Sequence, residues 1–350
     1  MVHDVRFKCC NTFKTKKTGR LRVSCPTCHK ETSRRICPEC SAELPYTWGQ
    51  QKEHVISIIG AKESGKSHYI AVLLDKIMKQ MSLNFKCSLQ ALNDETIHRY
   101  REDFYNPIYK RKETLNVTLS GRTNDMVKKP LLYNLSFYGK DFWGRKKISS
   151  VITLAFFDTA GEDLNNEDTM STVNKYIYNS SGIILLLDPL QFTDVREYLK
   201  RGSSIPQQNT DPYEILTRTI NIIHKGQDIP AQKLIDIPLA VTLSKLDALN
   251  NADIMFDESS VVKHPSPHIA KGSLQEKEFP LIYQEIRTFL TNFGGSNFVS
   301  LAESKFQKHS FFGISALGKS PQGTNKIDVV NPHRVEDPFL WLLSKNKILK

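Results

Sequence analysis

The stretch that decides the fold reads Gly60-Ala61-Lys62-Glu63-Ser64-Gly65-Lys66-Ser67. It matches the pattern G-x-x-x-x-G-K-S, in which glycines let successive backbone N–H groups face one anion. A run of β-branched residues, 55–59, precedes it, and residues 67–81 follow with apolar side chains at helical spacing. The helix N-terminus adds partial positive charge beside the loop. The order of strand, loop and helix therefore predicts a site for a nucleotide phosphate.

Two side chains of this loop have separate expected roles. Lys66 should reach the β and γ phosphates, where its charge would assist phosphoryl transfer. Ser67 should supply a hydroxyl ligand to Mg²⁺. The other loop residues predicted to line the phosphate site are Gly60, Lys62, Glu63, Ser64 and Gly65.

A second motif follows an apolar strand expected at 151–157. It reads Asp158-Thr159-Ala160-Gly161-Glu162. A carboxylate at the end of a second core strand is where a phosphate-binding-loop fold places its Mg²⁺-linked acid, so we assign that role to Asp158. The N–H of Gly161 is placed to sense the γ-phosphate.

Two further strand ends carry groups suited to a base. Residues 241–243 lead into Ser244-Lys245-Leu246-Asp247, and residues 312–314 lead into Ser315-Ala316-Leu317. The Asp247 carboxylate can accept two hydrogen bonds from guanine N1–H and N2–H₂, a pair that adenine does not offer. The Lys245 stem can lie along the base plane. A backbone N–H within 315–317 could meet guanine O6.

These four elements occur in the order of the G1, G3, G4 and G5 motifs. Residues 54–350 therefore resemble a P-loop GTPase of the TRAFAC (Ras-like) class. The resemblance implies GTP or GDP binding with Mg²⁺ and nucleotide-dependent switch loops. It also implies a switch I threonine, for which Thr114 is favoured over Thr118 and Thr123.

Two residues depart from this pattern. Ser244 stands where Asn or Thr usually opens the fourth motif, which keeps an ATPase as an alternative. Glu162 stands where Ras-like hydrolases carry a water-positioning Gln, and a carboxylate there would repel the γ-phosphate. We therefore expect slow intrinsic hydrolysis, with Lys66, Thr114 and Glu162 as the residues closest to the chemistry.

A finer resemblance is to the bacterial double-GTPase-like family of conflict (defence) systems. It rests on the N-terminal cysteine-rich module, the stretch of about ninety residues between the first and third motifs, and the segments 187–190 and 337–343. It implies a molecular switch with protein partners in a larger assembly, including a role in antiviral defence.

The N-terminal residues 1–47 predict a zinc ribbon. Cys25-Pro26-Thr27-Cys28 and Cys37-Pro38-Glu39-Cys40 form two C-P-x-C knuckles separated by eight residues. Two facing knuckles supply the four thiolates that tetrahedral Zn²⁺ prefers. Cys9 and Cys10 are left open: one joins a second site with His29, or both are free.

The expected fold class is a three-layer α/β sheet with flanking helices, because strands alternate with helices after the ribbon. Strands are predicted at 55–59, 115–119, 131–138, 151–157, 183–187, 238–243 and 311–314. Helices are predicted at 67–81, 92–113 with a break near Pro107, 213–224 capped by Asp211, 275–293, and 337–348 capped by Asp337.

The charge and composition of the chain determine what we expect of its partners and its location. The 350 residues carry 48 Lys and Arg against 37 Asp and Glu, a net charge of +11. Residues 1–53 carry +6 and residues 110–147 carry +7, so nucleic acid is an alternative partner for the basic ribbon. No apolar run approaches the ~20 residues of a membrane span, and no secretory signal is present. These features predict a cytoplasmic protein without membrane contact, and they leave its oligomeric state open.

Overall fold

A seven-stranded sheet forms the centre of the protein. The computed structural model describes residues 6–15, 20–37, 43–44, 48, 52–115, 130–158, 175–199, 211–249, 256–319 and 325–349. The spatial order of the strands is β13-β12-β11-β7-β10-β9-β8. Their bounds are β7 (Lys52–Gly60), β8 (Cys87–Ala91), β9 (Leu131–Lys140), β10 (Lys146–Asp158), β11 (Gly182–Leu187), β12 (Leu239–Leu243) and β13 (His309–Gly313).

The five strands from β13 to β10 are parallel, whereas β9 and β8 pair antiparallel at one edge. All six residues of β11 and all five of β12 are buried. Continuous burial is expected where both faces of a parallel sheet are covered by helices. The predicted α/β class is therefore confirmed.

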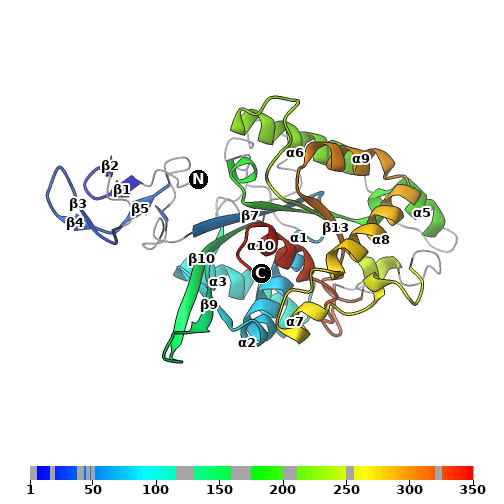
Figure 1. The fold of residues 1–350 in the computed structure, drawn as a ribbon, viewed down its shortest axis with the longest axis horizontal. Coiled ribbons are helices and arrows are strands. Elements are labelled where there is room, and N and C mark those ends of the chain that lie inside the picture. The colour runs from blue at the N-terminus through cyan, green and yellow to red at the C-terminus, as the bar shows by residue number, and fades with distance from the viewer. Residues whose placement is uncertain are drawn as a thin grey trace.

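Helices cover both faces of this sheet (Figure 1). Helices α6 (Pro212–Gln227) and α9 (Ser296–Lys305) pack together on one face, while α1 (Lys66–Lys76) and α10 (Asp337–Lys345) lie against the other. Helix α8 (Glu278–Asn292) packs on β13. The shorter helices are α2 (Ser82–Asn84), α3 (Asp94–Arg99), α5 (Thr193–Leu199) and α7 (Pro267–Lys271).

Two local expectations differ from the structure. A break was expected near Pro107, but the π-helix η2 (Tyr100–Arg111) continues through it. Proline lacks the N–H that bonds one turn back, and here wide π-type turns carry the helix past it. Asp337 was expected to cap α10, but Glu336 occupies the cap position. Asp337 is instead buried, with an oxygen 2.8 Å from Arg334 Nη1.

Other differences concern elements without a strong sequence signal. The edge strand β8 and helix α9 were not predicted. The expected strand at 115–119 lies outside the described residues beyond Leu115. The predicted cap at Asp211 is confirmed, because its Oδ1 accepts the N–H of Tyr213 at 2.9 Å.

The N-terminal module is a set of short strands. Strands β1 (Arg6–Lys8), β2 (Thr12–Lys14), β5 (Arg35–Ile36) and β6 (Glu43–Leu44) form one sheet, and β3 (Val23–Ser24) pairs with β4 (Glu31–Thr32). Phe7 is fully buried under the Arg35 guanidinium, 4.8 Å from its ring centroid. Phe7 and Trp48 belong to the same apolar cluster as Leu132 on β9 and Ala155 on β10. This cluster joins the module to the main sheet.

Among the described residues, no helix combines the length and the apolarity needed to cross a membrane.

A buried histidine gives the fold a pH-dependent stability. His268 is fully buried, its Nδ1 accepts the N–H of Gln275 at 2.9 Å, and its ring centroid lies 4.8 Å from that of Phe279. Burial lowers its pKa to about 4, outweighing the opposing effect of the nearby Glu336 and Glu278. The folded protein therefore keeps His268 neutral at pH values where the unfolded chain protonates it.

We expect a His268→Phe variant to lose less stability than the wild type on acidification. Between pH 7 and pH 5 the unfolded histidine, with a pKa of about 6.5, binds a proton that the folded one excludes, which favours unfolding. This contribution should be about 2 kcal/mol. Urea unfolding of both proteins at pH 7 and pH 5 measures it. Equal losses in the two proteins would contradict this assignment, because Asp337 and the other charges nearby are common to both.

Candidate nucleotide-binding site and cysteine cluster

The phosphate-binding loop starts at a residue that has to be glycine. Gly60 ends β7 with φ of 154°, and a Cβ there would lie 2.4 Å from the Leu186 carbonyl oxygen and 2.7 Å from Ser64 Oγ. The loop can therefore pass this close to β11 only without a side chain at position 60. Gly65 has φ of 87° and precedes α1, in the left-handed region that favours glycine.

The Lys66 side chain lies back over the loop. Its Nζ donates to the carbonyl oxygens of Gly60 at 3.1 Å and Ala61 at 2.6 Å, and the residue is 6% exposed. This position holds one positive charge at the N-terminal end of α1, whose first turn contains no acidic residue. Lys62 and Glu63 are exposed at the loop tip. The local geometry and charge of the loop are compatible with anion binding, and its role in holding a phosphate stays a prediction.

Ser244 connects the base-binding segment to this loop. Its Oγ lies 2.9 Å from the Ser64 carbonyl oxygen and 3.0 Å from that of Leu187, and its N–H donates to Leu187 O at 2.8 Å. The residue is 4% exposed. The Ser244 hydroxyl therefore fixes the end of β12 against the loop. The effect of serine at this position on the choice of base stays a prediction, and the ATPase alternative stays open.

Lys245 is held by a buried carboxylate at the end of the neighbouring strand. Its Nζ lies 2.7 Å from Oδ2 of Asp188, whose side chain has no exposed surface. Lys245 has φ of 51°, a left-handed conformation uncommon for a lysine. Asp188 also accepts the N–H of Leu190 at 2.9 Å, so the carboxylate is itself fixed in place. The ion pair sets the direction in which the Lys245 stem leaves the chain.

Asp247 is oriented by the last predicted motif. Its Oδ1 accepts a short hydrogen bond from Ser315 Oγ, which in turn accepts the N–H of Gly318 at 2.8 Å. The Ser315 N–H donates to the His333 carbonyl oxygen at 3.0 Å. Ser315 therefore contributes its hydroxyl to this end of the site, and the contacts of Ala316 and Leu317 with a base stay a prediction.

Part of the predicted catalytic machinery lies beyond what is described. Asp158 is the last residue of β10, and its Cα pairs with that of Ile58 on β7, two residues before Gly60. Its side chain, and all of Thr159, Gly161 and Glu162, lie outside the described residues. The roles of Asp158 in Mg²⁺ binding and of Glu162 in hydrolysis stay predictions, supported by this position of β10.

The segment in which switch I is predicted is tied to α1 by His68, which sequence reasoning missed. His68 Nε2 accepts the N–H of Leu115 at 3.1 Å, and burial lowers the pKa of this imidazole to about 4. The Thr114 N–H donates to Asn325 O at 2.8 Å. The signal available in the sequence was a histidine directly after Ser67. Thr118 and Thr123 lie outside the described residues.

Four cysteines converge in the N-terminal module, and they differ in part from the predicted set. The Sγ atoms of Cys9, Cys10, Cys25 and Cys28 all lie within 4.8 Å of one another. Cys37 is not in this group, and Cys40 lies outside the described residues. The knuckle Cys25–Cys28 is thus paired with the two adjacent cysteines whose role the sequence left open.

The distances within this cysteine cluster suit zinc. Cys9 Sγ lies 3.4 Å from Cys28 Sγ, and Cys10 Sγ lies 3.6 Å from Cys25 Sγ. Zn–S bonds of about 2.3 Å in a tetrahedron place sulfur atoms about 3.8 Å apart. Backbone N–H groups of the knuckle, chiefly that of Cys28, lower the pKa of Cys25 to about 6, which favours its thiolate form. Hydrogen bonding with Cys28 raises the pKa of Cys9 to about 11, and hydrogen bonding with Cys25 raises the pKa of Cys10, so these two thiols hold their protons in the metal-free cluster. The four thiols can therefore form an S₄ site with little movement.

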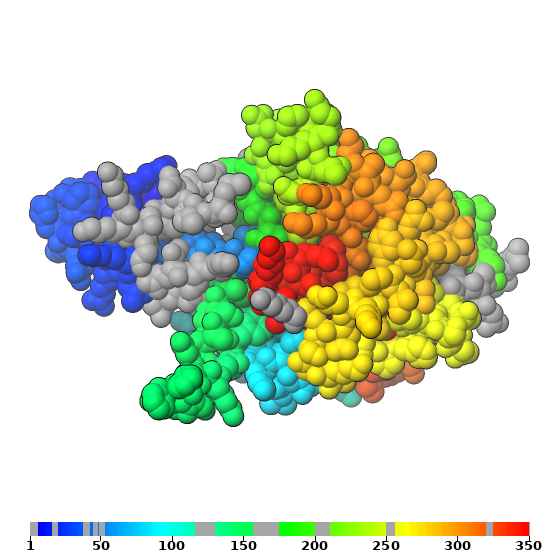
Figure 2. Space-filling view, in the orientation of Figure 1, coloured from blue at the N-terminus to red at the C-terminus, as the bar shows by residue number. Residues whose placement is uncertain are grey.

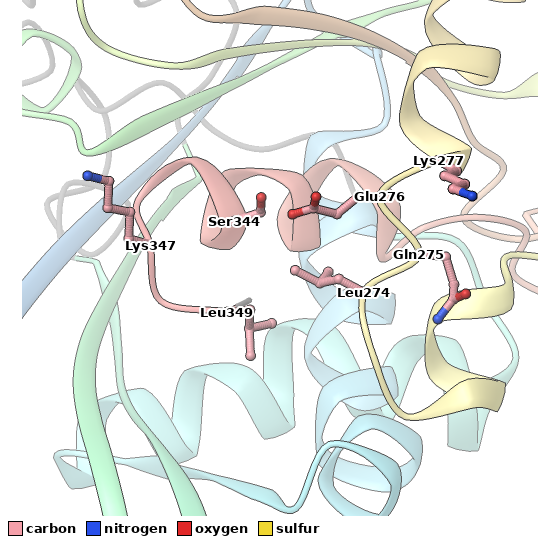
Figure 3. Close-up of a pocket in the computed structure, with 7 residues that line it drawn as sticks. All are labelled: Leu274, Gln275, Glu276, Lys277, Ser344, Lys347 and Leu349. Carbon is pink, nitrogen blue, oxygen red and sulfur yellow. The ribbon is translucent and has the colours of Figure 1, made fainter.

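A pocket near the C-terminal end of α10 lies away from these motifs. It has a volume of about 770 Å³ and is lined by residues 274–277 together with Ser344, Lys347 and Leu349 (Figure 3). These residues come from the segment before α8 and from the end of α10, and none belongs to a nucleotide motif. The pocket therefore supports no role in nucleotide binding.

Comparison with known proteins shows a curated protein that is similar in sequence. The chain is 26% identical over 327 residues to SaeC of Mycolicibacterium smegmatis, whose name records a proposed role in ESX-1 scaffolding and assembly. The match covers 88% of this chain and 79% of SaeC. No protein-family model matches the chain.

Solved structures with partial likeness include GTPases. The small GTPase Arl6 of Trypanosoma brucei, bound to GppNp, is 12% identical with a TM-score of 0.33, over 85% of this chain and all of Arl6. The GTPase-like domain of S. cerevisiae Ski7, bound to GTP, is 15% identical with a TM-score of 0.34, over 86% of this chain and 51% of the Ski7 chain.

Proposed function

We propose that this protein binds GTP with Mg²⁺ and hydrolyses it slowly, as a molecular switch within a larger assembly. The observation that carries the proposal is the Ser244 tether. It holds Ser64 of the phosphate-binding loop against the segment that contains Asp247. One rigid unit thereby contains a phosphate cradle at one end and a base-reading carboxylate at the other.

The proposed Mg²⁺ site lies at the same edge of the sheet as the phosphate-binding loop. Ser67, at the start of α1, and Asp158, at the end of β10, would hold Mg²⁺ beside the phosphates. Bound Mg²⁺ would neutralise charge on the β and γ phosphates. Lys66 would bind those oxygens, Gly161 would sense the γ-phosphate, and Thr114 would belong to switch I. Glu162 in place of a glutamine supports slow turnover by the isolated protein.

Asp247 is the residue on which the choice of GTP over ATP depends. A carboxylate accepts from both guanine N1–H and N2–H₂, whereas the adenine edge would leave it with an unmatched acceptor. The hydrogen bond from Ser315 fixes the carboxylate before the base arrives. Pre-orientation of this kind increases discrimination, because less ordering is required on binding.

We expect the wild type to prefer GTP over ATP by at least about tenfold, or ~1.4 kcal/mol. Asp247→Asn should lose GTP affinity and gain affinity for xanthosine triphosphate, because xanthine carries an oxygen where guanine carries its amino group. The cost for GTP should be roughly 1–3 kcal/mol. Titration calorimetry with the three nucleotides measures these changes.

The matched control is Asp236→Asn, which changes an exposed carboxylate on the segment before β12. This control should bind all three nucleotides as the wild type does. If the wild type binds ATP as tightly as GTP and Asp247→Asn changes neither, Asp247 does not read the base. The ATPase alternative would then replace the proposal.

The domain organisation, partners and compartment of the proposed switch rest on separate observations. We place residues 1–47 and 54–350 in two units, with the cysteine module as a docking element for protein partners. Likeness to SaeC along most of both chains supports a role in the assembly of a multi-protein system. Metal-binding thiolates require a reducing compartment, which supports the cytoplasm. A defence role rests on the motif resemblance alone, and the neighbouring genes would test it.

A further inference from the structure

The hairpin formed by β9 and β10 extends away from the body of the protein (Figures 1 and 2). Every residue from 142 to 150 is exposed. At the turn, Phe142 is 95% exposed and Trp143 is 76% exposed, and Ile148 on β10 is 52% exposed. The hairpin tip, residues 139–150, therefore presents its largest apolar side chains at its outermost point.

The turn that carries these rings is rigid. Asp141 Oδ1 accepts the N–H groups of Trp143 at 2.9 Å and Arg145 at 2.8 Å. The Asp141 N–H donates to Arg145 O at 2.9 Å, and the Gly144 N–H donates to Asp141 O at 3.0 Å. Gly144 has φ of 75°, which glycine adopts without strain. Local hydrogen bonds thus fix the direction of Phe142 and Trp143 without any help from the protein core.

The rings themselves do little for the folded state. Their centroids lie 5.7 Å apart in an edge-to-face arrangement, and neither ring belongs to a described core cluster. Large apolar side chains left in water forgo the free energy of burial. Two adjacent ones on a rigid turn indicate a surface that is covered when the protein binds something.

Basic side chains surround these rings at the base of the turn. The hairpin tip contains Lys140, Arg145, Lys146 and Lys147 against the single acid Asp141, a net charge of +3. Lys146 and Lys140 are cross-strand partners, and the Lys146 ammonium lies 4.3 Å from the ring centroid of Tyr138. Aromatic rings thus lie outermost and cations lie behind them along the hairpin.

We propose that the hairpin tip binds the surface of an anionic lipid membrane. Phe142 and Trp143 would enter the boundary between headgroups and acyl chains, where aromatic rings are favoured. Lys140, Lys146 and Lys147 would remain at the level of the lipid phosphates, which attract basic segments, while Arg145 stays paired with Asp141 at 3.1 Å. Because this contact is peripheral, it needs no membrane-spanning helix. It would revise the expectation from the sequence that the protein makes no membrane contact.

Two other occupants fit the tip less well. Single-stranded nucleic acid stacks its bases on open ring faces along a basic groove, whereas these rings meet edge to face at the end of a convex hairpin. The cores of protein–protein interfaces are depleted of lysine. This tip carries lysines directly behind its two rings, so a protein partner fits it less well. The separation of rings from cations along the hairpin favours the membrane.

The test uses the full-length protein and vesicles of phosphatidylcholine with or without about 30% phosphatidylglycerol. Co-sedimentation should show at least about tenfold stronger binding to the anionic vesicles, weakened by high salt. Trp143 also reports insertion directly, because the other two tryptophans, Trp48 and Trp341, are 7% and 3% exposed. A blue shift of fluorescence on binding, absent with Trp143→Phe, places this ring in the lipid.

Variants separate the contributions of rings and charges. Phe142→Ala and the pair Lys146→Glu with Lys147→Glu should each weaken vesicle binding at least about tenfold. The matched control Leu83→Ala removes an apolar side chain that is 77% exposed on α2, and it should bind as the wild type does. All of these variants should keep the far-UV circular dichroism spectrum and the thermal unfolding midpoint of the wild type, which shows that they fold.

Failure of the wild type to bind anionic vesicles would overturn the proposal. So would binding that Phe142→Ala leaves unchanged, since charge alone would then account for it. Tighter binding to a single-stranded oligonucleotide, with Trp143 quenched by the bases, would assign the tip to nucleic acid instead. These outcomes are independent of whether the phosphate-binding loop prefers GTP.

Discussion

Replacing Lys66 with alanine is expected to lower GTP affinity at least about a hundredfold, or ~2.7 kcal/mol. The Lys66 ammonium is the side-chain cation that the loop holds against its own carbonyl oxygens, 2.6 Å from that of Ala61. On nucleotide binding this charge would be shared with the β and γ phosphates. Charge-assisted hydrogen bonds to phosphate are roughly twice as strong as neutral ones, and in a site this enclosed they are little screened.

The matched control is Lys62→Ala in the same loop. Lys62 is exposed at the loop tip, and its loss should change affinity by less than about threefold at moderate salt. Lys66→Met keeps most of the apolar stem and tests whether the loop has collapsed. If calorimetry shows unchanged affinity in Lys66→Ala, residues 60–67 do not bind the triphosphate. Loss in Lys66→Ala with full retention in Lys66→Met would indicate a packing effect and not a charge effect.

The phosphate-binding loop could be predicted from the sequence because its geometry is local. The glycines at positions 60 and 65, the preceding strand and the following helix all belong to one continuous segment, from Lys52 to Lys76. The role of Ser244 could not be predicted in this way. Its hydroxyl contacts Ser64, 180 residues earlier, and this contact exists only once β12 and β7 are in the same sheet.

The grouping of cysteines in the N-terminal module could likewise be predicted only in part, because it depends on contacts between separate segments. The knuckle Cys25–Cys28 follows from its spacing, and the structure has the tight turn, with the His29 N–H donating to Cys25 O at 2.9 Å. Which second pair faces this knuckle depends on how β1 and β3 are placed, and equal spacing made Cys37 the better candidate. The structure places Cys9 and Cys10 beside Cys25 and Cys28, and because Cys40 lies outside the described residues, the pairing of the two C-P-x-C knuckles stays a prediction.

Edge elements were the hardest to predict. Strand β8 has mostly half-buried residues and pairs with one neighbour, so its sequence alternates weakly. Helix α9 starts at Ser296 directly after the Gly294-Gly295 pair that signals the end of α8, and the two helices are separated by that turn alone. Tertiary packing decides such elements, and sequence periodicity carries little information about them.

We expect the cysteine cluster to bind one zinc ion per chain, and removal of this ion to have a large effect on the N-terminal module. Removal of the metal should unfold residues 6–37, because apart from its cysteines this short segment buries little apolar surface beyond Phe7, Val23 and Ile36. Zinc binding supplies about 10–16 kcal/mol in isolated zinc-finger peptides, which far exceeds what such a core provides. Loss of zinc should therefore appear as loss of protease resistance before residue 52, with residues 54–350 intact.

Single substitutions decide which thiolates hold the ion. Cys10→Ser and Cys25→Ser should each abolish stoichiometric zinc, whereas Cys37→Ser should retain it and Cys87→Ser, a buried cysteine on β8, serves as the control. Cobalt substitution adds a readout of ligand number, because the charge-transfer band from thiolate scales with the sulfur atoms bound. Zinc lost in Cys37→Ser but kept in Cys10→Ser would restore the two C-P-x-C knuckles as the ligand set. Cys9 and Cys10 would then meet Cys25 and Cys28 as neighbours of the metal site and not as ligands.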